Sequence, residues 1–264
     1  MNGMEFDLAY LCKEVREIAR ASATFLKEER RKFDRNLVEE KSAHNYVSYV
    51  DKESERRIIE ALSTLLPEAG LVTEEGFGSL TDEEYCWVID PLDSTSNYIH
   101  DIAPYYVSIA LRNREELLLG VVHEVCRDEC FYAVKDGKAY LDRNEIHVSD
   151  VSVLDKAFVA LGFPYNSDAY RPVAAHLVDR LSGFAGGTRL IGSAAAELCY
   201  VAAGRFDARI ESYLGSWDVA VGALILLQAG GKISDFDGGK NCFFSEEVVA
   251  SNSKIHTLAL SLLP

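Results

Sequence analysis

Three acidic motifs stand where predicted strands end or where a predicted helix begins. Strand ends meet at one edge of a sheet, where ligands commonly bind in α/β proteins. Carboxylates gathered at such an edge would suit Mg²⁺, which prefers hard oxygen ligands. Each motif alone is most often a helix cap, a turn or a solvated loop, but three in one chain are hard to explain as coincidence. The motifs are Thr73-Glu74-Glu75-Gly76, Asp90-Pro91-Leu92-Asp93 and Trp217-Asp218.

The motif that begins at Asp90 offers ligands for both a metal ion and a phosphate group. Asp90 follows a run of large apolar residues, so we expect its carboxylate at the end of a buried strand. Asp93 is expected to cap a helix that opens at 94–95, which leaves the first backbone amides of that helix available to phosphate. The two carboxylates and the Leu92 carbonyl oxygen are suitable Mg²⁺ ligands.

These residue types predict metal-assisted hydrolysis of a phosphate monoester. The phosphate dianion repels hydroxide, and paired metal ions both neutralise charge and lower the pKa of a bound water. Water would then attack in line with the departing oxygen. No Cys or His lies in the three motifs, so we expect no covalent phosphoenzyme.

The pattern of apolar residues predicts the elements that must position these motifs. Spacings of three and four predict a long helix over 8–25, and a second helix follows a short strand at 46–50, with Asp51 as its expected cap. Consecutive strands over 105–140 predict an antiparallel meander, and strands alternate with helices over 157–234. We expect an α+β fold, a layered α-β-α-β-α sandwich. Its N-terminal sheet would be antiparallel and its C-terminal sheet smaller and mixed, with helices between and outside the sheets.

The organisation of the chain is expected to be a single catalytic unit over 1–264. No repeat or linker-like tract marks a boundary. The approximate halves are 1–147, with the metal and phosphate motifs, and 148–264, with the substrate side and Asp218.

The composition excludes several classes of protein. The chain has 264 residues, 42 acidic and 27 basic, which gives a net charge of −15, and 48% of its residues are hydrophobic. Such a chain is not disordered, and its charge disfavours nucleic acid and anionic membranes as partners. The N-terminus lacks a signal-peptide pattern and no apolar run is long enough to cross a membrane, so we expect a cytoplasmic protein with reduced thiols. Cys126 and Cys130 form a C-x3-C pair without a second pair, which is a poor zinc motif.

The motifs together resemble those of the inositol monophosphatase family, which are magnesium-dependent, lithium-sensitive phosphatases. The family signature W-x-x-D-P-[IL]-D-G-T-x-N-[FY] matches residues 87–98 except that Ser94 replaces a glycine. The second signature, W-D-x-A-A-G-x-x-[IL]-[IL]-x-x-A-G-G, matches 217–231 with Val221 in place of a small residue. Glu-Glu-Gly at 74–76 and the strand that leads to Asp51 match in the expected order.

The resemblance implies a role for each site residue. Glu74, Asp90 and the Leu92 carbonyl would form a first Mg²⁺ site, and Asp90, Asp93 and Asp218 a second. A third ion would bind more weakly near Glu74, so each site would hold two or three Mg²⁺ ions. Thr95 and Asp51 would hold and deprotonate the attacking water, and the amides of residues 94 and 95 would hold phosphate. The implied set is Asp51, Thr95 and Glu74 as catalytic residues, Glu74, Asp90, Leu92, Asp93 and Asp218 as metal ligands, and Asp93, Ser94, Thr95, Ala194, Glu211 and Asp218 as substrate-binding residues.

The resemblance also implies the substrate, a small phosphorylated polyol or sugar. Asn97-Tyr98 resembles the branch that converts inositol 1-phosphate to myo-inositol, and Glu211 would accept hydrogen bonds from ring hydroxyls. Other phosphatases of the superfamily remain open, acting on fructose 1,6-bisphosphate, 3′(2′),5′-bisphosphate nucleotides or histidinol phosphate. Two non-enzymatic functions also remain open: the chain could be a catalytically weak interaction module or a divalent-ion binder. A homodimer is implied as well.

Ser94 is the one departure that touches the phosphate loop. If this position requires a positive φ, serine carries a steric penalty that glycine does not. The hydroxyl could also add a hydrogen-bond donor, so the sequence leaves the direction of the effect open.

Overall fold

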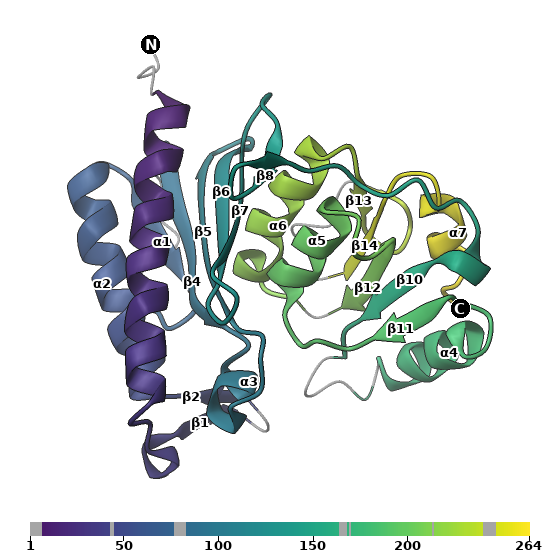
Figure 1. The fold of residues 1–264 in the computed structure, drawn as a ribbon, viewed down its shortest axis with the longest axis horizontal. Coiled ribbons are helices and arrows are strands. Elements are labelled where there is room, and N and C mark those ends of the chain that lie inside the picture. The colour runs from purple at the N-terminus through teal and green to yellow at the C-terminus, as the bar shows by residue number, and fades with distance from the viewer. Residues whose placement is uncertain are drawn as a thin grey trace.

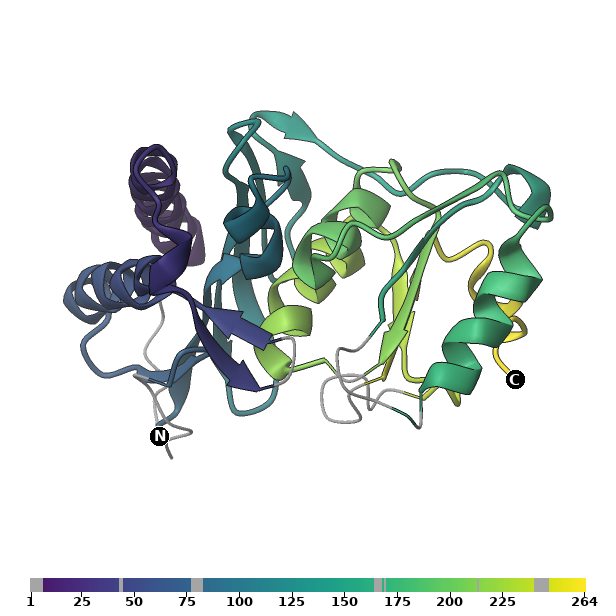
Figure 2. The same ribbon diagram turned by 90° about the horizontal axis from the view of Figure 1, so that it is seen from below.

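The fold is built from alternating layers of helix and sheet (Figures 1 and 2). The computed structural model describes residues 7–42, 45–76, 83–163, 168, 170–212, 214–239 and 247–264. In the order of the layers, helices α1 (Leu8–Arg30) and α2 (Tyr49–Leu65) cover one face of a large sheet. Helices α5 (Ala194–Ala202) and α6 (Ser216–Gln228) separate it from a smaller sheet, and α4 (Arg171–Leu181) and α7 (His256–Leu260) lie outside that. The predicted α-β-α-β-α sandwich is confirmed.

The large sheet follows the order of its strands in the sequence and is antiparallel except at one edge. There β3 runs parallel to β4, with Thr73 opposite Ile89. Both strands therefore end at the same edge, which places Glu74 beside Asp90. The strands are β3 (Gly70–Thr73), β4 (Tyr85–Asp93), β5 (Tyr106–Asn113), β6 (Leu117–Glu124), β7 (Glu129–Val134), β8 (Ala139–Leu141) and β9 (Asn144–Glu145).

The small sheet is mixed, as predicted. Strand β10 is parallel to β11 and β12, whereas β14 is antiparallel to both β12 and β13. Strand β14 and helix α7 had not been predicted, and β11 lies two residues earlier than expected. In spatial order the strands are β11 (Gly187–Arg189), β10 (Phe158–Leu161), β12 (Ala208–Ser212), β14 (Glu247–Ser251) and β13 (Lys232–Ser234).

A short hairpin and a short helix close the end of the molecule near the acidic motifs. The hairpin is β1 (Glu39–Ser42) with β2 (Asn45–Val47), and α3 (Thr95–His100) packs beside β2. Single 3₁₀ turns occupy Arg35–Leu37 and Leu154–Lys156.

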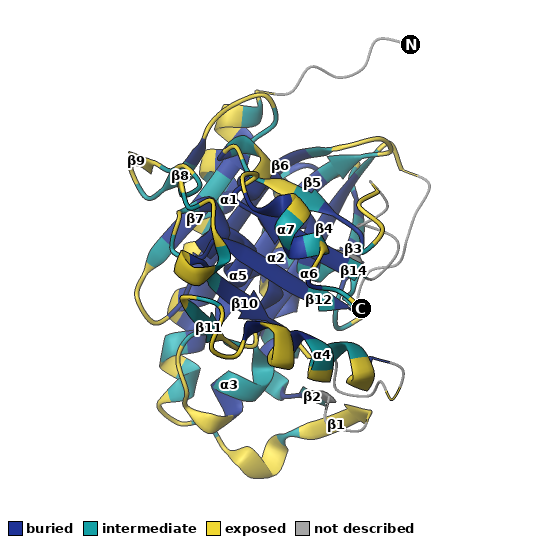
Figure 3. Cartoon of the chain, turned by 90° about the vertical axis from the view of Figure 1, so that its right-hand side faces the viewer, coloured by how far each residue is buried: buried dark blue, intermediate teal, exposed yellow. Residues whose placement is uncertain are grey.

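Apolar side chains fill the spaces between the layers, and the strands and central helices that enclose these spaces are largely coloured as buried in Figure 3. One core lies between α1, α2 and the large sheet, where Trp87 is fully buried. A second surrounds α5 and α6, and every residue of α5 is buried, as befits a helix enclosed by two sheets. No helix in the described residues is long and apolar enough to cross a membrane. The described cysteines are free thiols, namely Cys12, Cys86, Cys126, Cys130 and Cys199, while Cys242 lies outside the described residues.

Candidate active site

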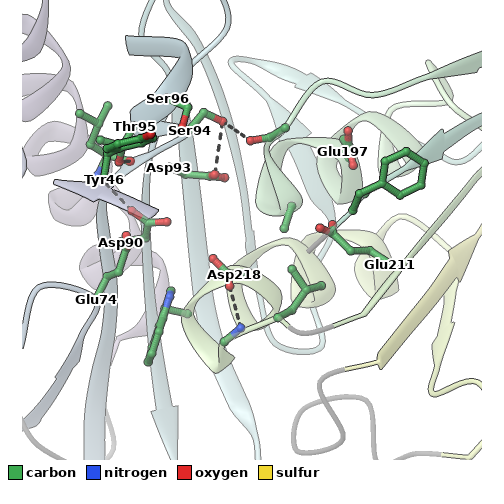
Figure 4. Close-up of a pocket in the computed structure, with 18 of the residues that line it drawn as sticks. Tyr46, Glu74, Asp90, Asp93, Ser94, Thr95, Ser96, Glu197, Glu211 and Asp218 are labelled. Carbon is green, nitrogen blue, oxygen red and sulfur yellow. Dashed lines mark hydrogen bonds between the residues drawn. The ribbon is translucent and has the colours of Figure 1, made fainter. Parts of the chain in front are cut away.

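A cavity of about 530 Å³ opens at the edge where β3 and β4 end. Figure 4 shows Glu74 and Asp90 on one side, Glu197 and Glu211 on the other, and Asp218 between them. Asp51 lies behind this lining, at 1% exposure. The predicted site residues that line the cavity are Glu74, Asp90, Leu92, Asp93, Ser94, Thr95, Ala194, Glu211 and Asp218.

The beginning of α2 holds Asp51 against Thr95. Ser48 is the N-cap of α2, and Asp51 is its third residue, whose carboxylate accepts hydrogen bonds from the Ser48 N–H (2.8 Å) and hydroxyl (2.6 Å). The prediction that Asp51 caps the helix was therefore wrong by three residues, since Ser48 supplies the better cap. The other carboxylate oxygen of Asp51 accepts a hydrogen bond from the Thr95 hydroxyl at 2.9 Å. Burial raises the pKa of Asp51 to about 6, against the lowering effect of these hydrogen bonds.

Asp90 and Glu74 meet because their strands are parallel neighbours. Asp90 is 2% exposed, and its carboxylate accepts a hydrogen bond from the Leu92 N–H at 3.0 Å. Burial raises the pKa of Asp90 well above its ordinary value, and the nearby carboxylates of Glu74 and Asp93 raise it further.

Asp93 ends β4 and binds the beginning of another helix. Its carboxylate accepts a hydrogen bond from Ser193, the N-cap of α5. The expected capping of α3 by Asp93 was wrong, because its carboxylate is turned toward Ser193 and Ser94 occupies the N-cap position of α3. Burial raises the pKa of Asp93 to about 7, although the Ser193 hydrogen bond opposes this.

Ser94 has the positive φ that makes glycine favourable at this position. Its φ is 76° and its ψ is 49°, in the left-handed region. Its hydroxyl donates to the Gly192 carbonyl at 2.6 Å, and the Asn97 side-chain amide donates to the Ile191 carbonyl at 3.0 Å. The loop before α3 is thereby connected to the segment that leads into α5.

Asp218 enters the cavity from the first turn of α6. It is the third residue of that helix and accepts a hydrogen bond from the Gly215 N–H at 2.7 Å. Burial raises the pKa of Asp218 to about 8, with further contributions from Glu74 and Asp93. The carboxylates of Glu74, Asp93 and Asp218 therefore repel one another across the cavity.

Lys41, on β1, supplies positive charge to this edge. Its ammonium lies 3.3 Å from Glu74 and 2.6 Å from Glu75. Burial lowers the pKa of Lys41, but the two glutamates outweigh it and raise the pKa. Burial also raises the pKa of Glu75 to about 7, even with Lys41 beside it.

The donor set of the cavity suits a hard divalent cation. Its carboxylates present oxygen atoms, and burial, followed by the neighbouring carboxylates, raises the pKa of Asp90, Asp93 and Asp218. A bound cation would favour the ionised form of these three groups. Among the described residues, no three His, Cys, Asp or Glu side chains are already grouped as ligands of one ion. Ser193, Leu92, Gly215 and Lys41 each hold a carboxylate in its present orientation.

Two functional candidates were missed from the sequence, Glu197 and Arg209, and the hydrogen bond of Ser193 to Asp93 was not foreseen, although Ser193 lies in the predicted turn that opens a helix beside the substrate. Ser193 could have been found as an N-cap before an apolar helix. Arg209 and Glu211 are two charged residues on one face of an otherwise apolar strand, which was also a usable signal. Glu197 gave none, because a single acid in a helix is normally solvated.

The family model for the inositol monophosphatases matches residues 7–264. This chain belongs to the inositol monophosphatase family. Membership supports a phosphatase, in agreement with the chemistry of the acidic cavity.

The similar proteins and solved structures match between 82% and 96% of this chain. Nus factor SuhB of Escherichia coli K12 is 37% identical over 218 residues, 82% of this chain and 81% of the relative. The structure of extragenic suppressor protein suhB from Bartonella henselae has a TM-score of 0.91 and 28% identity, covering 96% of this chain and 98% of that one. A Thermotoga maritima IMPase has a TM-score of 0.86 and 28% identity, covering 94% of each chain.

Proposed function

We propose that this chain hydrolyses the phosphate monoester of a small polyol, with inositol 1-phosphate as the model substrate, in a reaction that requires Mg²⁺. The observation that carries the proposal is the meeting of two features in one cavity. The first is the hydrogen-bonded pair of Thr95 and Asp51, and the second is the group of carboxylates from β3, β4 and α6. The curated relatives are named Nus factors, which names no substrate, so the substrate rests on the site.

Mg²⁺ would be held by these carboxylates and one carbonyl. Glu74, Asp90 and the Leu92 carbonyl would hold one ion, and Asp90 with Asp93 and Asp218 a second, with a third, weaker ion near Glu74. When bound, the ions would lower the pKa of water and offset charge on the phosphate and on the leaving oxygen.

Thr95 and Asp51 would receive the proton of the attacking water. Asp51 is buried behind Thr95, so the threonine hydroxyl is its route to the cavity. That hydroxyl also lies 3.1 Å from the Leu92 carbonyl, and its single proton can be donated to only one of the two. When it is donated to Asp51, an oxygen lone pair of Thr95 is free to accept from water. Burial raises the pKa of Asp51, which makes its carboxylate a stronger base toward this proton.

The beginning of α3 and the far wall would hold the substrate. The first hydrogen bond of α3 is donated by the Tyr98 N–H to the Ser94 carbonyl, so the amides of residues 94 and 95 precede it and would bind phosphate oxygens. On the opposite wall, the Glu211 carboxylate is placed to accept hydroxyl hydrogen bonds from the polyol, and Ala194 adds a small apolar contact.

A phosphate-release assay tests the proposal. Inositol 1-phosphate, fructose 1,6-bisphosphate, 3′-phosphoadenosine 5′-phosphate and p-nitrophenyl phosphate are compared in Mg²⁺, in EDTA, and in Mg²⁺ with Li⁺. We expect the highest kcat/KM for inositol 1-phosphate, no turnover in EDTA and inhibition by Li⁺. A higher value for another ester would reassign the substrate within the family.

Two variants separate catalysis from a general effect of charge. Asp90→Asn is expected to lower kcat more than 100-fold, because it removes a charged ligand shared by both proposed ions. Asp101→Asn is the control, since Asp101 is exposed, pairs with Arg30 and has a φ of 59° that asparagine tolerates. Near-normal Mg²⁺-dependent activity in Asp90→Asn would end the proposal.

We also expect a homodimer, which sedimentation equilibrium would test.

A further inference from the structure

A buried arginine lies between the substrate wall of the cavity and helix α5. The side chain of Arg209 is 0% exposed. Its Nε donates to Glu197 at 2.9 Å, and its Nη2 donates to Glu211. A fully buried guanidinium must be paired to be tolerated, so these two carboxylates hold the arginine in place.

The two acids differ in their access to the cavity. Glu197 is 1% exposed and also accepts a hydrogen bond from the Ile191 N–H at 3.0 Å, which makes it a fixed internal anchor. The Glu211 side chain is 14% exposed and faces the cavity. Arg209 therefore connects a buried anchor to an acceptor that a ligand can reach.

The backbone of Gly162 confines Glu211 from a second side. A Cβ added to Gly162 would lie 1.9 to 2.3 Å from the carboxyl atoms of Glu211, so the carboxylate packs directly against the end of β10. Only a residue without a side chain permits this position. The Glu211 carboxylate is thus held by one N–H of the planar Arg209 guanidinium on one side and by backbone on the other.

We propose that Arg209 is a positioning residue that sets the specificity for hydroxyl-bearing leaving groups, acting through Glu211. By occupying Oε2 of Glu211, it leaves Oε1 as a fixed acceptor for one hydroxyl of the substrate. The inference rests on the proposed phosphatase function. A carboxylate that is already ordered loses little freedom when the substrate binds, which favours affinity for a polyol over an ester that has no hydroxyl at this point.

The test uses Arg209→Lys, which keeps the charge but loses the planar group whose Nε and Nη2 donate to Glu197 and Glu211. We expect KM for inositol 1-phosphate to rise about tenfold, the usual effect of misplacing one charge-assisted hydrogen bond. KM and kcat for p-nitrophenyl phosphate should change less than twofold. Arg205→Lys is the control, since Arg205 also donates two hydrogen bonds to carboxylate oxygens, both of them to Glu129 at 2.7 Å, and lies outside the cavity. It should change neither substrate.

A double-mutant cycle with Glu211→Gln shows whether Arg209 acts through Glu211. In the Glu211→Gln background, Arg209→Lys should give no further rise in KM for inositol 1-phosphate. Independent, multiplicative effects would overturn the inference, as would equal effects on both substrates. If Arg209→Lys does not fold, as judged by thermal unfolding, Glu211→Gln alone still decides, because an unchanged KM for inositol 1-phosphate overturns it. A wild-type chain that hydrolyses neither ester would instead overturn the proposed function itself.

Discussion

The strained serine of the phosphate loop gives a prediction that does not depend on catalysis. Ser94 has a φ of 76°, which costs a residue with a Cβ about 1–2 kcal/mol relative to right-handed backbone. Its hydroxyl donates to the Gly192 carbonyl at 2.6 Å, which contributes about 1 kcal/mol. The two terms oppose each other, and substitutions can separate them.

Alanine and glycine at this position should differ in a defined order. Ser94→Ala loses the hydrogen bond and keeps the strain, so we expect a loss of about 1 kcal/mol. Ser94→Gly loses the same bond but relieves the strain, and the extra chain entropy of glycine takes back roughly 0.5–1 kcal/mol of that relief. Ser94→Gly should therefore be more stable than Ser94→Ala by about 0.5–1 kcal/mol. For a chain of this size that is about 1–4 °C in Tm.

Thermal unfolding followed by circular dichroism in EDTA measures the order without a contribution from bound metal. Ser96, inside α3, is the control, because there right-handed backbone should make the glycine variant less stable than the alanine variant by about 1 kcal/mol. The reasoning would be refuted if Ser94→Gly were less stable than Ser94→Ala, or if both positions showed the same order.

Three further predictions concern the carboxylates. Asp93 and Asp218 have folded pKa values of about 7 and 8 and an ordinary value of 3.8, so in EDTA they stabilise the folded chain at low pH and this stability is lost as the pH rises toward 8. Asp218→Asn should make the fall in the free energy of unfolding between pH 6 and 8 less steep, by up to about 1.4 kcal/mol per pH unit, and an unchanged slope would contradict this. Gly162→Ala should displace Glu211 and raise KM for inositol 1-phosphate but not for p-nitrophenyl phosphate. Equal kinetics for wild type and variant would show that the backbone at residue 162 can move enough to accommodate a Cβ. Lys41→Met should lower Tm more at pH 8 than at pH 6, since it leaves Glu75 buried beside Glu74 without its cation, and a loss independent of pH would argue against that pairing.

Local patterns were enough to predict most elements of the fold. The spacing of apolar residues in α1 and the consecutive strands β5 to β7 are set by near neighbours in the chain. The parallel pairing of β3 and β4 could not be predicted, because it depends on the path of the segment between them. Strand β14 is short and follows a segment without periodicity, so nothing in the sequence identified it.

The candidate site was predictable where its residues share a motif. Asp90, Leu92 and Asp93 lie within four positions, and their convergence with Glu74 and Asp218 was inferred from strand ends and helix starts. The helix caps were misplaced, because the choice among Ser48, Asp51 and other polar residues depends on which side chain the tertiary structure draws away. The pairing of Arg209 with Glu197 joins a strand to a helix, which residue types alone do not reveal.

The position of β14 bears on the order in which the protein can be completed during synthesis. Residues 247–251 lie between β12 and β13, and Val248 is the partner of Glu211 in the antiparallel register. Every proposed metal ligand leaves the ribosome before this strand does. A nascent chain that ends before residue 247 would therefore carry every proposed metal ligand. Strand β12, which carries Glu211, would still have one unpaired edge. The small sheet is therefore completed only when β14, the last strand of the chain, inserts between β12 and β13, which are both synthesised before it.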